Sequence, residues 1–325
     1  MLDSGAFSAW NSGITINIQD YITFCLHNQD ELDYIVNLDV IPGQPFKKVT
    51  KEDRKISTLQ GWENYKTMLR GGIPKDKLIH VFHQGEDMEW LERMVKEISY
   101  IGLSPANDKT TGQKMAWLDQ CMKYVTNNQG TPIVKFHGFA VTTLRLVFRY
   151  PWYSVDSSSW QLRGGGYGLI DVPKNPEMLT KKEHHYVRSI PIGKGVKKYG
   201  KEHELTSLFS VDRITQCDVS FLKTPSYKKN LETFLKKYGF ALEELQNNAG
   251  LRAAWNAIYL IMSTSKFSNT MIYLATSDLK AVRVLRRKMR QAQLDLDKIN
   301  ILVSFATLGK KSKRFDTLIK LKHTQ

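Results

Sequence analysis

Two aspartates, Asp3 and Asp156, have the side-chain chemistry of a catalytic carboxylate pair. Substitution at the anomeric carbon of a sugar passes through an oxocarbenium-like transition state. A retaining enzyme needs one carboxylate as nucleophile and a second as acid/base about 5 Å away. Asp3 lies in the run LDSGAF and Asp156 lies in YSVDSSSW. Runs such as DSG also form turns, so the two residues alone leave both catalysis and turn formation open.

The elements that would position this pair are strand-like runs that alternate with amphipathic helical patterns. Eight such runs cover residues 1–5, 33–41, 77–85, 99–104, 133–141, 152–158, 269–277 and 299–307. Several are apolar almost throughout, as expected for strands covered on both faces. We therefore predict an α/β fold, a (β/α)8 TIM barrel, with an open doubly wound sheet as the alternative.

Polar residues and glycine recur near the ends of the first six runs. In a barrel, the C-terminal ends of the strands carry the catalytic surface. The residues at these ends are Asp3, Asp39, Gln84, Ser104, Gly138 and Asp156. Each alone could shape a turn, but six turns that all bring such residues to one rim favour a site. The barrel would place Asp3 and Asp156 across its mouth from each other.

Residues 163–230 interrupt the alternation and are basic, glycine-rich and punctuated by proline. The segment is longer than an ordinary connection, which predicts a functional insertion or a disordered segment after the sixth strand. Its run GGGYG is not followed by GK[ST] or a helical pattern, which favours a flexible loop over a phosphate loop. We predict one barrel domain over 1–325 with 163–230 as a basic insertion.

The formal net charge of +15 is unevenly placed along the chain. Residues 1–162 carry 17 Lys and Arg against 18 Asp and Glu, whereas 163–230 and 279–325 have net charges of +6 and +10. Such a distribution suits a protein that meets a polyanion over part of its surface, and nucleic acid is the first candidate. A helical pattern places four arginines on one face, opposite an apolar face: Arg283, Arg286, Arg287 and Arg290. The basic run KKSKR follows at 310–314.

Other features argue against several classes of protein. The cysteines Cys25, Cys121 and Cys217 are far apart and odd in number, so we expect neither a disulfide framework nor a Cys-X-X-Cys metal site. His184 and His185 lack further ligands at metal spacing, and His80, His83 and His137 do not form a familiar ligand set. We predict no metal. No run approaches the roughly 18 apolar residues of a membrane span, and the N-terminus does not read as a signal peptide, so we expect a cytoplasmic protein without membrane contact.

An ordered set of short motifs resembles the tRNA-guanine transglycosylase family, and most of all its DNA-acting branch of phage and bacterial deazapurine modification proteins. The motifs are LDSGAF, VNLDVIPG, VFHQG, YIGLS, HGF and YSVDSSSW, and they cover residues 1–168. Beyond that point only the alternation of strand-like and helical runs supports the resemblance. It implies a pentosyltransferase that exchanges guanine in nucleic acid for a free 7-deazaguanine such as preQ0, without any cofactor.

The resemblance also implies roles for individual residues. Asp156 would attack C1′ of a guanosine unit and hold it as a glycosyl ester, and Asp3 would handle the proton of the leaving or entering base. Asp39 would accept hydrogen bonds from the base edge, Gln84 would donate to O6, and Phe7 would stack on the ring. The matching positions that complete the base site are Gly102, Leu103, Ser104, His137 and Gly138.

Two departures from the family favour DNA over tRNA as the substrate. The tRNA enzymes carry a zinc site of clustered cysteines and a histidine near the C-terminus, which this chain lacks, and the basic insertion after Asp156 is additional. A tRNA substrate and a nucleic-acid-binding barrel without catalysis remain as alternatives. A base inside a duplex cannot reach a barrel mouth, so the target nucleotide must be extruded. Trp160, Arg163 and the arginines at 283, 286, 287 and 290 are the candidate nucleic-acid contacts, although Trp160 could equally fill the rim.

Overall fold

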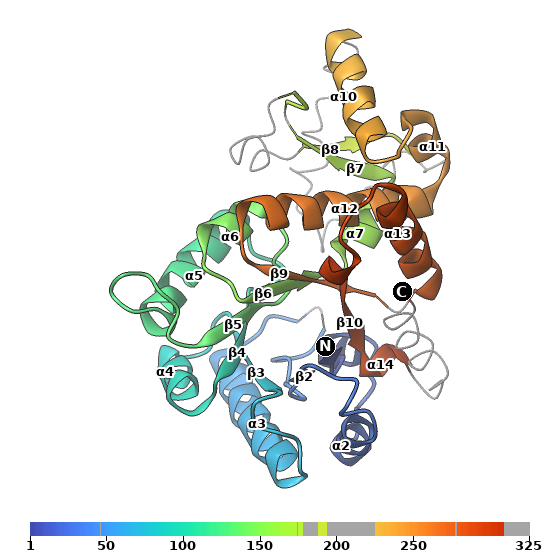
Figure 1. The fold of residues 1–325 in the computed structure, drawn as a ribbon. Helices are drawn as coiled ribbons and strands as arrows, with labels where there is room; N and C mark the ends of the chain where they lie inside the picture. Colours follow the sequence, from blue (N-terminus) through green and yellow to red (C-terminus); the bar gives the residue numbers. More distant parts are fainter. Residues whose placement is uncertain (46, 174, 178–187, 194–224, 277, 309–325) are drawn as a thin grey trace.

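The computed structural model describes residues 1–45, 47–173, 175–177, 188–193, 225–276 and 278–308. Eight parallel strands close into a barrel in the order β1-β10-β9-β6-β5-β4-β3-β2 (Figure 1). The strands are β1 (Leu2–Asp3), β2 (Ile35–Val36), β3 (Leu78–His83), β4 (Tyr100–Ser104), β5 (Lys135–Gly138), β6 (Ser154–Ser157), β9 (Met271–Ala275) and β10 (Asn300–Ser304). The (β/α)8 barrel is therefore confirmed over the open sheet, and each of the eight predicted runs contains one strand.

The first strand closes the barrel although it has only two residues. Leu2 is in register with Ile35 of β2 on one side and with Val303 of β10 on the other. Asp3 is in register with Ser304. Since both neighbours pair with β1, its last residue is fixed at the end of the barrel where the strands end, here called the mouth.

Helices surround the strands and begin at well-formed caps. The helices α3 (Lys51–Arg70) and α5 (Thr111–Val125) each start with a capping box, Thr50 with Asp53 and Thr110 with Gln113. The others that lie against the barrel or follow its strands are α1 (Ala6–Asn11), α2 (Ile18–His27), α4 (Met88–Glu97), α6 (Leu144–Arg149), α12 (Ala249–Phe267), α13 (Leu279–Gln291) and α14 (Phe305–Leu308). None of the helices in the described residues is both long and apolar enough to cross a membrane.

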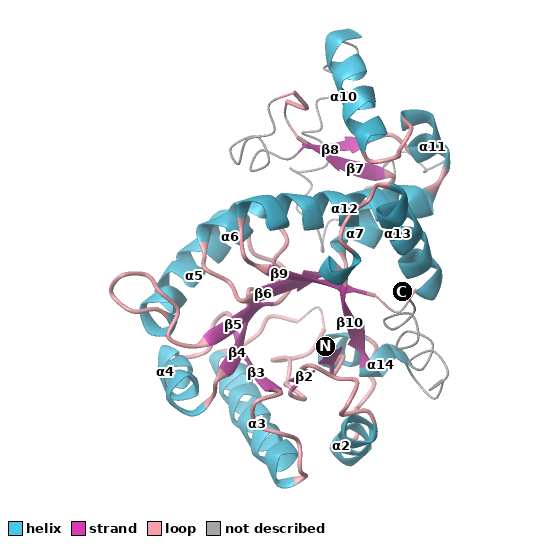
Figure 2. Cartoon of the chain, in the orientation of Figure 1, coloured by secondary structure: helices cyan, strands magenta, loops and turns pink. Residues whose placement is uncertain are grey.

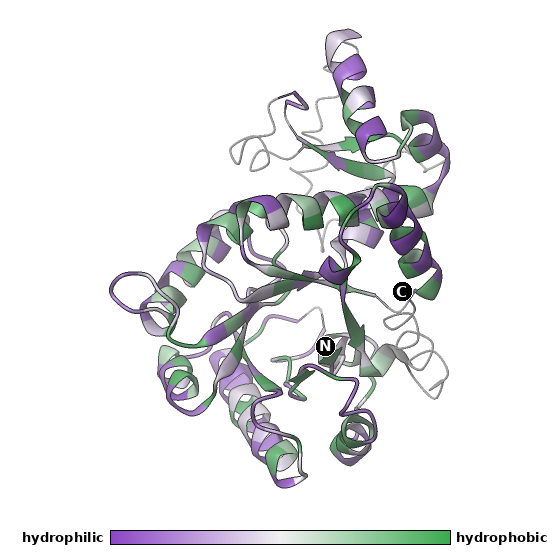
Figure 3. Ribbon diagram, in the orientation of Figure 1, coloured by the Kyte–Doolittle hydropathy of each residue, from purple (hydrophilic) through white to green (hydrophobic). Residues whose placement is uncertain are grey.

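The core has two layers, because successive strand residues point to opposite faces. The outer layer lies between strands and helices, and Figure 3 shows apolar residues along the strands beneath a largely hydrophilic α13. The inner layer fills the barrel with Val36, Ile79, Val81, Tyr100, Tyr273 and Leu302. Continuing this inward series by two residues reaches polar side chains at the mouth. Val81 leads to His83 on β3, and Met1 leads to Asp3 on β1.

The sixth connection carries a small subdomain. After β6 come α7 (Ser159–Gln161), a π-helical turn (Leu162–Gly166), the antiparallel pair β7 (Leu169–Val172) and β8 (Arg188–Pro191), and then α10 (Pro225–Lys237) and α11 (Leu242–Asn247). Figure 2 shows β7 and β8 on the far side of α12 from the barrel strands. Side chains of α12 hold β7: Trp255 Nε1 donates to Asp171 O at 2.7 Å, and Asn256 Oδ1 accepts from Asp171 N at 2.8 Å.

The glycine run 164–166 is a π-helical turn packed on α12, not the flexible loop that the sequence indicated. Gly164 is buried, and its carbonyl accepts a hydrogen bond from Arg252 Nε at 2.7 Å. A Cβ at Gly164 would overlap the backbone N of Ala253 and lie 2.7 Å from its Cα. The glycine is needed because two backbones approach each other here.

We expect Gly164→Ala to lower the free energy of unfolding by about 1–3 kcal/mol, because neither backbone can move aside without repacking α12. Gly165→Ala is the matched control, since a Cβ at Gly165 meets nothing within 4 Å. Thermal and urea unfolding of both variants measure the difference. Equal stability of the two variants would contradict the close packing of the turn against α12.

Candidate functional site at the barrel mouth

The DSG run fixes Asp3 at the mouth. Gly5 has φ +79° and is the N-cap residue of α1, and its N–H donates to Asp3 Oδ2 at 3.1 Å. The Ser4 hydroxyl accepts from Ala6 N at 3.2 Å. A Cβ at Gly5 would overlap the Ser304 side chain and Ala306, so both the positive φ and the close approach require glycine. The turn-forming and functional interpretations of this run are therefore compatible, because the turn orients the carboxyl group.

The surroundings of the Asp3 carboxyl group favour its protonated form. Burial raises its pKa from 3.8 to about 8, and repulsion from the carboxylates of Asp39 and Asp156 adds to the effect. Hydrogen bonds from the backbone of Gly5 and Ser4 oppose the shift without cancelling it. The structure thus brings together three carboxyl groups that the sequence places 36 and 117 residues apart. A protonated member of such a group can act as a general acid.

Asp156 lies at the end of β6 and is 8% exposed. Its Oδ1 accepts from His137 Nε2 at 3.2 Å and from the backbone N of Ala140 at 3.0 Å. Ala140 has φ +54°, one of two positive φ values at non-glycine residues in the described chain. Such a conformation is costly for alanine, and here it accompanies an N–H directed at the carboxylate. Both hydrogen bonds reach Oδ1, so within the described part of the chain Oδ2 is the oxygen without a hydrogen-bond donor.

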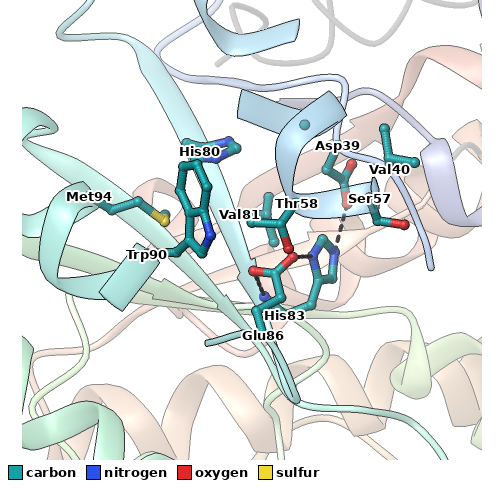
Figure 4. Close-up of a pocket in the computed structure, with 11 residues that line it drawn as sticks. Asp39, Val40, Ser57, Thr58, His80, Val81, His83, Glu86, Trp90 and Met94 are labelled. Carbon is teal, nitrogen blue, oxygen red and sulfur yellow. Dashed lines mark hydrogen bonds and ion pairs between the residues drawn. The ribbon is translucent and has the colours of Figure 1, made fainter. Parts of the chain in front are cut away.

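A second cluster at the mouth joins Asp39, His83 and Glu86 (Figure 4). His83 Nε2 lies 3.0 Å from Asp39 Oδ2, and His83 Nδ1 lies 3.4 Å from Glu86 Oε1. Burial lowers the pKa of His83, but the hydrogen bonds to both carboxylates outweigh it and raise the pKa to about 10. The imidazolium therefore donates from both nitrogens. Ser4 Oγ donates to Asp39 Oδ1 at 3.3 Å, which links the two clusters.

A small pocket lies behind this cluster, between β3 and the helices α3 and α4. Its lining includes Asp39, His80, His83, Glu86 and Trp90. The volume of about 10 Å³ has room for about one water molecule, so this pocket does not hold a nucleobase. His80 lies on its outer side, where Asn37 Nδ2 donates to Nδ1 at 2.9 Å and burial lowers the pKa to about 4.

The residues predicted to bind a base have different surroundings. Phe7 is 44% exposed on α1 and tilts against Trp10, with 5.8 Å between ring centroids. Both polar atoms of the Gln84 side chain bond to the backbone: Oε1 accepts from Ala106 N at 3.0 Å, and Nε2 donates to Gln113 O at 3.5 Å. The side chain fastens the segment between β4 and α5. Gln84 must release these bonds before it can donate to a base.

Strand β4 contributes mainly backbone to the mouth. Leu103 is fully buried in the outer core, and its carbonyl accepts from Phe139 N at 2.9 Å. A Cβ at Gly102 would overlap the Phe139 ring, so the ring packs directly against the backbone of Gly102. Ser104 is in register with His83 at the end of its strand. Phe139 belongs to the inner layer and is a candidate stacking residue that the sequence did not indicate.

The two predicted residues on β5 do not face the mouth. His137 is fully buried beneath Asp156, which it contacts directly. Gly138 points outward, where a Cβ would lie 3.0 Å from the Trp152 ring. The sequence also missed His83 and Glu86 as partners of Asp39. VFHQG places His83 at the strand end, but only the closed barrel brings it to Asp39, 44 residues away.

The predicted nucleic-acid contacts divide into two groups. Trp160 is 2% exposed and packs in the outer core, as in the rim-filling interpretation, and Arg163 Nη2 pairs with Asp171 Oδ1 at 2.5 Å. The arginines on α13 are more accessible: Arg283, Arg287 and Arg290 are exposed, and Arg286 is half-buried. His184, His185, Cys217 and KKSKR at 310–314 lie outside the described residues. Within those residues, no group of three or more His, Cys, Asp or Glu is arranged to hold a metal ion.

We compared the chain with protein families, curated proteins and solved structures. No family model, no curated protein and no solved structure matches the chain. The function must therefore be inferred from the residues at the mouth.

Proposed function

We propose that this chain is a DNA-guanine transglycosylase, which exchanges guanine for a 7-deazaguanine through a glycosyl ester of Asp156. One observation carries the proposal: two carboxyl groups at one barrel mouth are prepared for opposite roles. Asp3 has a pKa of about 8 and holds a proton, whereas Asp156 has one oxygen fixed by two N–H donors. Retaining substitution at C1′ needs such an acid and such a nucleophile.

The reaction has two balanced halves. Asp156 Oδ2 attacks C1′, the bond from C1′ to N9 of guanine breaks, and N9 takes the electron pair. Asp3 donates its proton to the departing base, so guanine leaves neutral and Asp3 becomes a carboxylate. The incoming 7-deazaguanine then gives its N9 proton to Asp3, its N9 attacks C1′, and Asp156 leaves as a carboxylate. No redox cofactor or nucleoside triphosphate takes part.

Asp39 supports recognition of a guanine-like edge. Each carboxylate oxygen can accept more than one hydrogen bond, so Oδ1 and Oδ2 keep capacity beyond Ser4 and His83. The N1–H and the exocyclic amine of guanine are two parallel donors that match this capacity. His83 holds Asp39 in one orientation through the charged hydrogen bond at 3.0 Å. A base edge with acceptors at these positions would be rejected.

DNA as the polymer is supported by the distribution of charge. The basic segments 163–230 and 279–325 both follow the catalytic aspartate in the chain. The helix α13 starts directly after β9 ends and exposes Arg283 and Arg287. Arginines along one helix suit contact with a phosphate backbone. Binding should therefore weaken steeply as salt is raised.

Base exchange can be measured directly. The protein and a labelled 7-deazaguanine are incubated together with one polymer in each reaction: duplex DNA, single-stranded DNA or tRNA. The nucleosides of the recovered polymer are then analysed by mass spectrometry. We expect label in DNA together with an equal amount of released guanine. Incorporation into tRNA alone would replace DNA by tRNA as the substrate. Binding without release of guanine from any polymer would contradict the proposal.

A further inference from the structure

A chain of buried polar side chains continues from Asp156 into the barrel. His137 Nε2 contacts Asp156 Oδ1 at 3.2 Å, His137 Nδ1 contacts Ser154 Oγ, and Ser154 Oγ also contacts the Tyr100 hydroxyl. His137 and Ser154 are fully buried, and Tyr100 is 1% exposed. The three residues come from β5, β6 and β4, so neighbouring strands fix their spacing. Nothing in the two-carboxylate reaction itself uses them.

The hydrogen-bonding capacity of these groups sets the direction of the protons. A serine hydroxyl donates one bond, so Ser154 cannot donate to both Tyr100 and His137. If Tyr100 donates to Ser154, the Ser154 proton has an acceptor in this chain when His137 Nδ1 carries no proton, and the ring proton then lies on Nε2, directed at Asp156. Burial raises the pKa of the Tyr100 phenol above its ordinary value, so Tyr100 keeps the proton that it donates. Every group in the chain then has a partner.

The opposite direction is less satisfactory. Nδ1–H would donate to Ser154, and Ser154 would donate to Tyr100, whose own proton would then have no acceptor among the residues that the structure describes. A neutral His137 in that tautomer would direct a lone pair at the Asp156 carboxylate. Both features cost free energy in a buried site. The arrangement that starts at Tyr100 avoids both.

We propose that His137 is a positioning residue for Asp156, held by Ser154 and Tyr100 as the neutral tautomer with its proton on Nε2. This inference rests on the proposed function of Asp156. His137 Nε2–H and Ala140 N–H hold Oδ1 and leave Oδ2 to attack C1′. In the glycosyl ester, Oδ1 is the carbonyl oxygen, so the same two donors face it. They stabilise the charge that returns to Asp156 when the incoming base displaces the ester.

Substitutions at His137 separate a donor from a merely space-filling side chain. Loss of one such donor costs about 100-fold to 1,000-fold in other enzymes, so His137→Leu should lower kcat by about 100-fold or more, with little change in KM for the base or for DNA. His137→Gln can place an N–H near the position of Nε2 and should recover a large part of this loss. Equal kcat values for His137→Leu and the wild type would overturn the inference.

The hydroxyl groups are tested by a matched pair of tyrosines. Tyr100→Phe removes the first donor of the chain and Ser154→Ala removes the second, and both should lower kcat less than His137→Leu. Tyr153→Phe is the control, because Tyr153 also lies inside the barrel but bonds Tyr34 at 3.1 Å instead of Ser154. We expect wild-type kcat for Tyr153→Phe. The same loss in Tyr153→Phe and Tyr100→Phe would contradict the assignment.

The tautomer can be observed without any assay of exchange. In protein labelled with ¹⁵N-histidine, the signals that disappear in His137→Gln belong to His137, and their shifts report which nitrogen carries the proton. We expect Nε2–H in the wild type and a mixture of tautomers in Ser154→Ala. Nδ1–H or a stable imidazolium in the wild type would overturn the inference. Absence of exchange with a correct Nε2–H signal would instead contradict the proposed function and leave the tautomer established.

Discussion

Asp156→Asn is expected to abolish base exchange while the barrel and its affinity for DNA remain close to those of the wild type. An amide is a poor nucleophile, so the glycosyl ester cannot form and the exchange rate should fall by at least about 1,000-fold. The fold is expected to tolerate the change because asparagine has the same shape and its Oδ1 can accept the N–H bonds from His137 and Ala140. Single-turnover exchange measures the rate.

The covalent intermediate gives a second measurement for this variant. Wild-type protein mixed with DNA in the absence of an incoming base and then denatured with acid should retain a protein–DNA adduct, whereas Asp156→Asn should not. Asp30→Asn is the matched control, because Asp30 is exposed in the connection between α2 and β2, at the opposite end of the barrel. A persistent adduct in Asp156→Asn would mean that another residue is the nucleophile.

The strands and the order of rim residues could be predicted from the sequence because both depend on local patterns. Apolar runs of strand length determine β3, β4 and β9 wherever they lie in the chain. Even β1, with two paired residues, was located correctly, since its last residue, Asp3, begins the turn-forming run DSG. The position of a residue at the end of a strand then follows from the barrel geometry without any knowledge of its neighbours.

Pairings between strand ends could not be predicted in this way. Which of several histidines contacts a given aspartate depends on strand register and on the inward or outward direction of each side chain. His83 and His137 face inward and contact Asp39 and Asp156, whereas His80 faces outward and bonds Asn37. From the sequence, the three histidines did not form a familiar metal-ligand set, and His137 was assigned to the base site, so neither contact with an aspartate was predicted. One residue of difference in register changes a hydrogen-bond partner into a core residue.

The sixth connection was the least predictable part of the described chain. Trp160 and Gly164 come soon after β6 in the chain, but both are packed against α12, which begins at residue 249. Contacts over such a separation leave no local pattern, so the sequence left the tryptophan open between a stacking group and a residue that fills the rim, and the glycines resembled a flexible loop. The antiparallel pair β7–β8 was also missed, because each strand has only four residues and 15 residues separate the two strands in the chain.

Asp3→Asn is expected to stabilise the protein above neutral pH and to inactivate it. The folded-state pKa of about 8 lies above the ordinary value of 3.8, so between these values the folded protein binds a proton that the unfolded chain does not. Stability from this group is therefore complete below pH 3.8 and is lost as pH rises to 8. Asparagine is neutral throughout, and at pH 8–9 it should raise the free energy of unfolding by a few kcal/mol relative to Asp3.

Activity should respond to the same proton with the opposite consequence. Wild-type exchange should decline above about pH 8, by about tenfold for each further pH unit, because Asp3 can no longer donate to the departing base. Asp3→Asn should be slower by about 100-fold to 10,000-fold at pH 7 and lack this decline. Urea unfolding and single-turnover exchange between pH 5 and 9 give both profiles, with Asp30→Asn as the control.

The two profiles together distinguish an acid from a structural carboxyl group. If Asp3 only shapes the turn before α1, its asparagine variant should keep exchange activity and its pH dependence. If Asp3 is ionised at pH 7, the stability of the variant and of the wild type should change in parallel from pH 5 to 8. One substitution is expected both to gain stability and to lose activity only if Asp3 is the acid. In that case burial beside Asp39 and Asp156 keeps Asp3 protonated for the reaction and lowers the free energy of unfolding where Asp3 must ionise.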